Sequence, residues 1–259
     1  MPVAALYDIH GNLPALEAVL REVRQAGVDR VVVGGDVIPG PMPRETLRCL
    51  LDLDLPVQFI HGNCELAVLA QMAAPEAGSV TYWGTVSGAP PPESDREIMR
   101  WTARQLGAEY EPVLASWPRT LRLEIGGLGE VLFCHGTPRS ETEVFTRLTP
   151  EDRLLPLFEG LNVSVVVCGH THMQFDRMIG TTRVVNAGSV GTPYGEPGAD
   201  WLLLGPIVEL RHTTYDLARA AEHIRATPFP RADEFAAREV LQPPSEGDML
   251  ELFTKAGLR

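Results

Sequence analysis

The sequence predicts an α/β protein, a four-layer α-β-β-α sandwich of two packed mixed sheets flanked by helices, with a small helical cap insertion. One observation is that short β-branched segments alternate with helical patterns near the N-terminus, as in parallel strands joined by crossover helices. The other is that short apolar segments follow one another closely in the second half of the chain, which favours mixed or antiparallel pairing.

The elements near the N-terminus follow from their hydrophobic period. Residues 13–26 carry apolar side chains at the i, i+3, i+4, i+7 spacing of a helix with one buried face. Residues 3–7 form a short, continuous apolar segment, the pattern of a strand buried on both faces. On the same reasoning, further strands are expected at 30–33 and 56–60, and a second helix at 44–51.

The second half of the chain is predicted to be rich in strands. These are expected at residues 120–125, 131–134, 164–168, 174–178, 183–186, 201–204 and 207–213. A helix at 216–226 follows, with Asp216 as its N-cap because a short side-chain acceptor favours that position.

We expect one domain over residues 1–259. Residues 73–116 interrupt the strand-helix alternation with clusters of Gly and Pro and contain one expected helix at 97–106, so we interpret them as a cap-like insertion. Residues 227–259 form a C-terminal tail that is first rich in Pro and then weakly helical.

The composition is that of an ordinary globular protein and excludes general binding to nucleic acids. Hydrophobic residues make up 44% of the chain, charged residues 22%, and the formal net charge is −12. Contact with a nucleic-acid backbone needs clustered Lys and Arg, which this balance does not favour. Phosphate chemistry is not excluded, because bound cations would reverse the local field.

The expected compartment is the cytoplasm, with no membrane partner. The four cysteines form no CxxC pair, which favours reduced thiols over a disulfide framework. The N-terminal residues lack the basic and apolar regions of a signal peptide. The apolar segments are far shorter than the ~20 residues that a membrane span requires.

Polar side chains with metal-binding chemistry follow five of the expected strands. They are Asp8, His10, Asp36, Asn63, His135, His170 and His172. Each group lies where ligands bind in open α/β sheets, at the carboxyl ends of the strands. The Asp-x-His and His-x-His pairs have i, i+2 spacing, which places both side chains on one side of extended backbone.

This set predicts a centre with two metal ions. Two carboxylates, four imidazoles and one amide form a mixed N/O set suited to Mn, Fe, Zn, Co or Ni. Seven donors exceed the needs of one tetrahedral ion and fit two ions held ~3.5–4 Å apart. Taken singly, an Asp-x-His pair is a weak sign of a ligand site, and a Gly-Gly-Asp is usually a turn. The evidence for a metal centre is that all five groups occur in this order at the ends of expected strands.

The same groups resemble the sequence blocks of the calcineurin-like metallophosphoesterases over residues 3 to about 190. The blocks stand as Asp8-Ile9-His10, Gly35-Asp36, Gly62-Asn63-Cys64-Glu65, His135-Gly136 and Gly169-His170-Thr171-His172. The segments at residues 40–43 and 186–191 are similar to the bacterial and archaeal branch that contains small phosphodiesterases and symmetrical diadenosine-tetraphosphate hydrolases. The resemblance implies the paired-sheet fold and phosphoester hydrolysis by attack of a metal-bridging hydroxide.

The resemblance also assigns roles to residues. It implies that Asp8, His10 and His172 hold one ion, that Asn63, His135 and His170 hold the other, and that Asp36 bridges them. The catalytic set is then Asp36, Asn63 and His135, and we add Asn12, which directly follows the first ligand pair and could orient the attacked phosphate. Manganese is the first expectation for the two divalent ions, with Fe, Ni, Zn or Co as alternatives.

One position departs from the family pattern. Many members have His after the Asn, as the acid that protonates the leaving group or as a stabiliser of the transition state, and this chain has Cys64. A thiol is a weak hydrogen-bonding group with an ordinary pKa of ~8.5, so the departure favours substrates with good leaving groups. His61 is an alternative proton source.

The substrate is expected to be a small phosphate ester or a nucleotide. Tyr82, Trp83 and Trp101 could stack a base, or could form the core of the insertion. Arg139 and Tyr194 could contact phosphate, or could be ordinary surface residues. A diadenosine-tetraphosphate hydrolase, a Ser/Thr-type protein phosphatase and a non-catalytic scaffold are the alternatives, and the sequence leaves the oligomeric state open, a homo-oligomer included.

Overall fold

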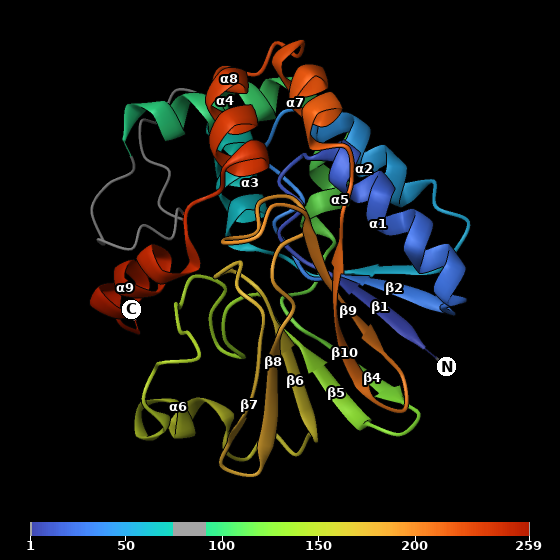
Figure 1. Cartoon of the computed structure of the whole chain (residues 1–259), viewed down its shortest axis with the longest axis vertical. Helices are drawn as coiled ribbons and strands as arrows, with labels where there is room; N and C mark the ends of the chain where they lie inside the picture. Colours follow the sequence, from blue (N-terminus) through green and yellow to red (C-terminus); the bar gives the residue numbers. More distant parts are fainter. Residues whose placement is uncertain (1, 75–91, 259) are drawn as a thin grey trace.

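The computed structural model describes residues 2–74 and 92–258, which contain two five-stranded mixed sheets (Figure 1). The first sheet has the strand order β10-β9-β1-β2-β3. Its strands are β1 (Val3–Leu6), β2 (Arg30–Val33), β3 (Val57–Phe59), β9 (Ala199–Leu204) and β10 (Val208–Thr213). β1, β2 and β3 are parallel, and β9 joins β1 in antiparallel register, pairing Val3 with Leu204.

The second sheet has the strand order β4-β5-β6-β8-β7. Its strands are β4 (Leu121–Ile125), β5 (Gly129–Phe133), β6 (Val165–Cys168), β7 (Phe175–Ile179) and β8 (Thr182–Asn186). β5, β6 and β8 are parallel, whereas β4 and β7 pair in antiparallel fashion at the two edges. Both sheets therefore place the carboxyl ends of their central parallel strands at one edge.

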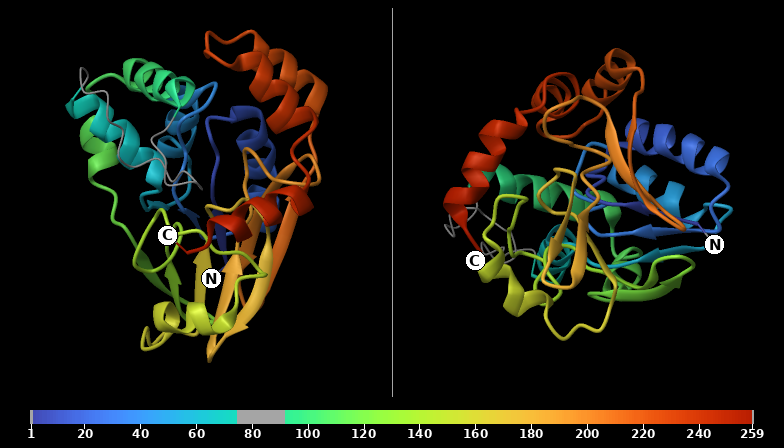
Figure 2. Two further views of the ribbon diagram at one scale, coloured as in Figure 1. Left: turned by 90° about the vertical axis from the view of Figure 1, so that its left-hand side faces the viewer. Right: turned by 60° about the horizontal axis from the view of Figure 1, so that its bottom comes forward.

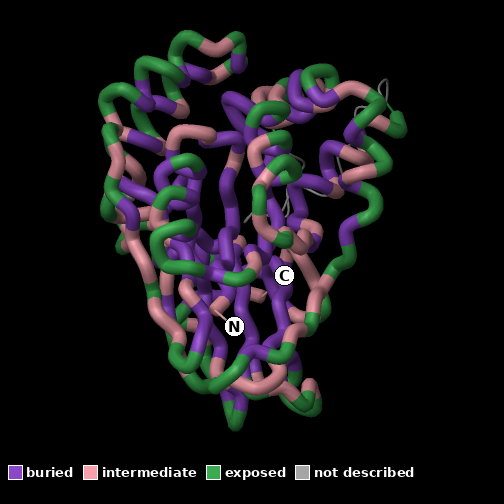
Figure 3. Tube along the Cα trace, turned by 90° about the vertical axis from the view of Figure 1, so that its right-hand side faces the viewer, coloured by how far each residue is buried: buried purple, intermediate pink, exposed green. Residues whose placement is uncertain are grey.

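The alternation of side chains along the strands builds the layers. In β1, Val3 and Ala5 face a buried cluster shared with the second sheet, while Ala4 and Leu6 face a cluster shared with the helices. The helices that cover the first sheet include α1 (Leu13–Ala26) and α2 (Pro43–Leu51). On the far side, α6 (Glu151–Phe158) covers the second sheet. These layers confirm the predicted four-layer sandwich, and Figure 3 shows its buried interior.

Apart from α9 (Glu246–Ala256), which lies midway along the molecule, the remaining helices gather at the end opposite the β4-β5 and β7-β8 hairpins (Figures 1 and 2). They are α3 (Asn63–Ala73), α4 (Glu93–Leu106), α5 (Glu111–Ala115), α7 (Leu217–Arg225), α8 (Ala232–Phe235) and a π-helix (Ala236–Leu241). Helix α4 begins at Glu93, four residues before the start predicted from the sequence, because Pro92 is its N-cap and acidic residues occupy its first turn. None of the described helices is both long and apolar enough to cross a bilayer.

The C-terminal tail packs against the insertion. Phe229, Ala232 and Val240 share one buried cluster with Trp101 of α4 and Ile224 of α7. The Trp101 and Phe229 rings meet edge to face with their centroids 5.3 Å apart. The tail is therefore helical and well packed, and it forms one wall over the carboxyl ends of the strands.

Candidate metal centre

The seven predicted ligands come together where the central strands of both sheets end. Asp8 and His10 follow β1, Asp36 follows β2, and Asn63 begins the helix after β3. From the second sheet, His135 follows β5, and His170 and His172 follow β6. The two sheets thus contribute side chains to one centre from opposite sides of the sandwich.

The side-chain atoms of this centre converge at short distances. The Nε2 atom of His172 lies 3.3 Å from Nε2 of His10 and 3.3 Å from Oδ1 of Asp8. The Nε2 atom of His135 lies 3.0 Å from Oδ1 of Asn63 and 3.5 Å from Oδ2 of Asp36. Imidazole nitrogens this close to one another and to carboxylate oxygens form an arrangement suited to a divalent cation.

The donor atoms fall into overlapping groups. Asp8, His10 and His172 form one group, and Asp36, His135 and His170 form another, with the donor atoms of each group within 4.8 Å of one another. A third group joins His10 and Asp36 to Cys64. Asp36 belongs to two of the groups and lies between the two sets of histidines. The sequence interpretation of Cys64 considered only an acid role, whereas the structure also brings its sulfur within reach of these donors.

The backbone of the centre is held in an unusual conformation. Among the described residues outside glycine, six have positive φ, and five of these are expected ligands. They are Asp8 (52°), His10 (47°), Asp36 (52°), His170 (65°) and His172 (55°). The left-handed region is sparsely populated by residues with a Cβ, and such strain gathers at functional sites. Here it turns the side chains inward at the strand ends.

Two buried polar atoms support the presence of metal ions. Within the described part of the chain, Oδ1 of Asp8 and Nε2 of His170 are buried and have no hydrogen-bond partner. An unpaired buried polar atom is costly, and a cation held by both groups would remove that cost. The residues present therefore fit a divalent metal centre.

Hydrogen bonds outside the centre fix how the histidines face it. The Nδ1 atom of His135 lies 2.9 Å from the carbonyl oxygen of Gly34, and Nδ1 of His172 lies 2.9 Å from that of Thr192. Donation from Nδ1 leaves the lone pair of each ring on Nε2, which points to the centre. The Tyr194 ring stacks on His172 with the centroids 5.2 Å apart and so restrains the ring further.

Glu65 organises the loop that carries Asp36. Its fully buried carboxylate accepts hydrogen bonds from the backbone N–H groups of Asp36 at 2.9 Å, Val37 at 2.8 Å and Gly62 at 2.7 Å. Burial and the negative charge of Asp36 raise the pKa of Glu65 to about 7, and the backbone hydrogen bonds oppose this rise. Glu65 is therefore a positioning residue for the strand-end loop rather than a ligand.

The charges of the centre are unevenly distributed. Burial, together with neighbouring histidines, lowers the pKa of both His10 and His170 to about 4, so these rings are neutral near pH 7. Burial also acts to lower the pKa of His135, but Asp36 and Asp8 outweigh it and raise that pKa to about 10. A metal ion at His135 must displace a proton, so its affinity should rise with pH.

The side chains of Asn12 and His61, for which catalytic roles were predicted, form hydrogen bonds within the fold. The Asn12 amide caps α1 by accepting from the backbone of Ala15 and donates to the carbonyl oxygen of Gly191 at 2.7 Å. These bonds give Asn12 a structural role, and its action on the attacked phosphate stays a prediction. Nε2 of His61 pairs with the Leu114 carbonyl oxygen at 2.8 Å, outside the metal centre.

The residues that were expected to contact the substrate lie in different environments. Trp101 is buried against Phe229, which confirms the core alternative for that residue. The exposed side chain of Arg139 pairs with the buried carboxylate of Glu143. Tyr82 and Trp83 lie outside the described residues.

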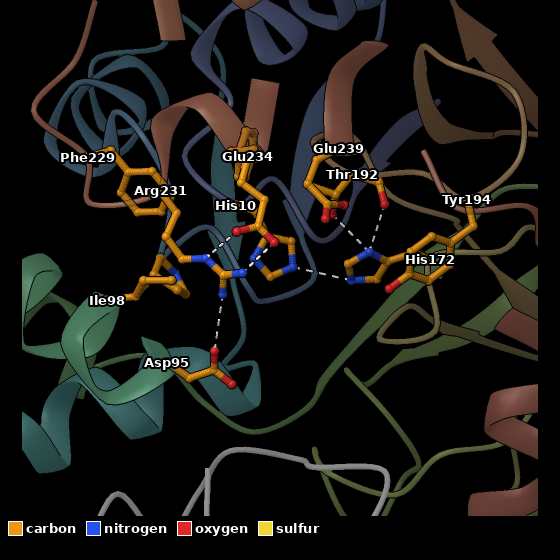
Figure 4. Close-up of a pocket in the computed structure, with 13 residues that line it drawn as sticks. His10, Asp95, Ile98, His172, Thr192, Tyr194, Phe229, Arg231, Glu234 and Glu239 are labelled. Carbon is orange, nitrogen blue, oxygen red and sulfur yellow. Dashed lines mark hydrogen bonds and ion pairs between the residues drawn. The ribbon is translucent and has the colours of Figure 1, made fainter. Parts of the chain in front are cut away.

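A pocket beside the centre was not foreseen from the sequence. It has a volume of about 260 Å³, and its floor includes His10 and His172 (Figure 4). Arg231, Glu234 and Glu239 of the C-terminal tail line it. No motif marks these residues, and only the packing of the tail onto α4 brings them to the centre.

Comparison with known proteins identifies the family. The calcineurin-like phosphoesterase superfamily domain matches residues 1–204. The chain therefore belongs to the calcineurin-like phosphoesterase superfamily, whose members are metal-dependent hydrolases, and the resemblance read from the sequence blocks is confirmed.

Two kinds of relatives extend this result. The uncharacterized protein MJ0912 of Methanocaldococcus jannaschii is 25% identical over 242 residues, which cover 86% of this chain and 91% of that protein. The hypothetical protein PH1004 of Pyrococcus horikoshii has a similar fold, with a TM-score of 0.75 at 22% identity over 91% of this chain and 97% of its own. A metallophosphoesterase of Sphaerobacter thermophilus superposes with a TM-score of 0.67 at 24% identity, over 92% of this chain and 99% of its own.

Proposed function

We propose that this protein is a hydrolase of small phosphodiesters or phosphomonoesters that uses two divalent transition-metal ions, manganese first among them, at the strand-end centre. The observation that carries the proposal is the convergence of seven N and O donors, which include two buried atoms without a hydrogen-bond partner, Oδ1 of Asp8 and Nε2 of His170. A phosphate ester or a nucleotide is the expected substrate.

The proposal assigns each donor to an ion. One ion is held by Asp8, His10 and His172, the other by Asn63, His135 and His170, and Asp36 bridges them. When bound, the two ions supply a nucleophile near neutral pH by lowering the pKa of water, and they stabilise charge on the phosphoryl oxygens.

The surroundings of Asp36 support its bridging role. Its Oδ1 accepts the backbone N–H of Cys64 at 2.9 Å, which leaves Oδ2 directed at the histidines. Oδ2 lies 3.5 Å from Nε2 of His135 and 3.9 Å from Nε2 of His10, the two sides of the centre. Although burial acts to raise the pKa of Asp36, the neighbouring His135 and His10 and a hydrogen bond from the Cys64 thiol hold it below its ordinary value, so the carboxylate is charged.

The residue beside Asn63 favours good leaving groups. Burial and the nearby Asp36 carboxylate raise the pKa of Cys64 well above its ordinary value, so the thiol is neutral near pH 7. A neutral thiol is a weak hydrogen-bond donor and gives a departing alkoxide little help. Activated esters and pyrophosphate links need less acid assistance, and we expect them to be cleaved faster than simple alkyl esters.

The proposal also treats the chain as one domain. Residues 73–116 would then act as a cap and residues 227–259 as a second wall, and of these segments the described residues 92–116 and 227–258 reach the pocket beside the centre. Burial of Phe229 against Trp101 supports this arrangement, because it joins the two segments.

Hydrolysis of bis-p-nitrophenyl phosphate tests the proposal. The manganese-loaded protein should release p-nitrophenolate above background, and Asp36→Asn should abolish release because the bridging charge is lost. Asp54→Asn, an exposed Asp-to-Asn change away from the centre, is the matched control and should keep wild-type activity. Activity in Asp36→Asn equal to the wild type would contradict the proposal, and cleavage of p-nitrophenyl phosphate alone would exclude the diesterase.

A further inference from the structure

The pocket beside the metal centre has a floor, two walls and a defined polarity. His10 and His172, both assigned to one ion, form its floor. One wall is Asp95 and Ile98 of α4, and the other is the stretch from Phe229 to Glu239 (Figure 4). A group attached to a phosphate over that ion would enter this pocket.

The size of the pocket limits its occupant. Its volume of about 260 Å³ is roughly that of eight or nine water molecules, at about 30 Å³ each. Pockets for drug-sized ligands begin at about 300 Å³. One small ring system therefore fits, and a long chain or a second large unit would extend into solvent.

The walls are largely apolar. Ile98, Phe229 and Phe235 line the side that faces away from the histidines, and Phe229 is fixed from behind by Trp101. The Phe229 and Phe235 rings meet at 88° with their centroids 6.0 Å apart, so each also holds the other in place. Rigid aromatic faces of this kind stabilise a flat ring by stacking and burial.

The charges of the pocket exclude a second anion. Asp95, Glu234 and Glu239 are acidic and Arg231 is basic, which gives one positive and three negative groups, a formal charge of −2. Arg231 is already shared, because its guanidinium pairs with Glu234 and lies 3.6 Å from Asp95. A further phosphate would meet this excess of carboxylates, so the group that enters is not anionic.

The carboxylates are also the main groups in the pocket that could form hydrogen bonds with an occupant. Within residues 2–74 and 92–258, no hydrogen bond or ion pair involves the carboxylate of Glu239. Carboxylates accept hydrogen bonds from hydroxyl and amino groups. The metal ion that His10 and His172 would hold on the floor, together with the Arg231 guanidinium in the wall, disfavours a cationic occupant.

We propose that this pocket binds the organic group of the substrate and selects an uncharged aromatic ring system bearing hydroxyl or amino hydrogens. This inference rests on the phosphoesterase function proposed above and adds the class of group that the ester carries. The ring lies between Ile98 and Phe229, and its polar hydrogens reach Glu239 and Glu234. The tail that supplies these residues is thus part of the substrate site.

Two diesters with the same leaving group test the inference. One is p-nitrophenyl thymidine 5′-phosphate, whose uncharged thymidine offers polar hydrogens on the ring nitrogen and on the sugar hydroxyl, and the other is methyl p-nitrophenyl phosphate. With manganese, the wild-type kcat/KM should be at least tenfold higher for the thymidine ester. p-Nitrophenyl phosphocholine, which carries a cation in place of the ring, should not exceed the methyl ester.

A variant that fills the pocket shows whether the preference arises there. Ile98 is half-buried and lines the pocket from α4, and Ile98→Trp should bring the ratio of the two kcat/KM values close to one. Glu239→Gln keeps the size of the side chain and should lower the ratio severalfold, which tests the pocket independently of any folding defect in Ile98→Trp. Leu210→Trp, at an exposed position of β10, is the matched control and should leave the ratio unchanged.

The outcomes separate the two proposals. Hydrolysis of both esters with equal efficiency by the wild type, or a preference that survives in both Ile98→Trp and Glu239→Gln, overturns the inference and leaves the phosphoesterase intact. Failure of the manganese-loaded wild type to hydrolyse either ester overturns the phosphoesterase and the inference that rests on it.

Discussion

Ser189 links the two sides of one proposed metal site. Removing its hydroxyl is the perturbation whose cost in stability the structure defines best. The side chain is fully buried, and Oγ donates to the carbonyl oxygen of Asp8 at 2.7 Å. The same Oγ accepts the backbone N–H of Thr192 at 2.8 Å. Thr192 in turn faces Nδ1 of His172, so one hydroxyl holds the backbone near two expected ligands.

The expected cost of Ser189→Ala follows from these contacts. The Asp8 carbonyl oxygen keeps a second partner, the N–H of Gly191 at 3.0 Å, so only the net value of one bond is lost there, about 0.5–1.5 kcal/mol. The Thr192 N–H is left buried without an acceptor, which costs about 1–3 kcal/mol. The free energy of unfolding should therefore fall by about 3 kcal/mol, and the affinity for manganese should fall with it.

Urea denaturation of the metal-free protein measures the first effect, and manganese titration measures the second. Ser116→Ala is the matched control: its Oγ also donates to a carbonyl oxygen, that of Val113 at 2.7 Å, but at an exposed site. The control should change stability by less than about 1 kcal/mol. A Ser189→Ala protein as stable as the Ser116→Ala protein would refute the reasoning.

Three further predictions concern sites with different physical causes. Gly34→Ala should lower the free energy of unfolding measured in urea by about 1–3 kcal/mol, because a Cβ there would lie 1.9 Å from a ring carbon of Tyr7. Gly205→Ala is the control and should not lower it, because the nearest atom to its Cβ would be 3.8 Å away. Burial raises the pKa of Asp200 to about 6, so the folded chain keeps a proton that the unfolded chain has released. As the pH rises from 4 to 6, the free energy of unfolding of the wild type should therefore fall by at most about 3 kcal/mol relative to that of Asp200→Asn. Equal pH profiles for the two proteins would exclude a raised pKa at Asp200. Cys64→His should accelerate hydrolysis mainly for esters with poor leaving groups, and an equal effect on all esters would show that leaving-group protonation is not what the wild type lacks.

The paired-sheet fold and the convergence of the candidate metal donors could be predicted because their signals are local. Segments such as residues 30–33 and 165–168 are short, β-branched and fully or almost fully buried, and the donors follow them directly in the sequence. Parallel strands must end at one edge, so strand-end residues far apart in the chain meet without further information. The left-handed conformation of Asp8 and its neighbours was not predicted, because nothing in the residue type requires it.

The pocket could not be predicted because it depends on packing between distant segments. Asp95 lies in the insertion and Arg231 in the tail, and neither belongs to a motif. The tail was expected to be weakly helical, yet Phe229 is buried against Trp101 and brings Arg231 over the centre. Asn12 illustrates the opposite case, since its proximity to the ligands suggested catalysis while its amide is used to cap α1.

The central claim is that the strand-end centre holds two metal ions bridged by Asp36, and the stoichiometry of manganese binding tests it most directly. Titration calorimetry of metal-free protein, with metal analysis of the loaded sample, should give two ions per wild-type chain and at most one for Asp36→Asn. A wild-type chain that retains no transition metal after loading, or an Asp36→Asn chain that still binds two ions, would contradict the account.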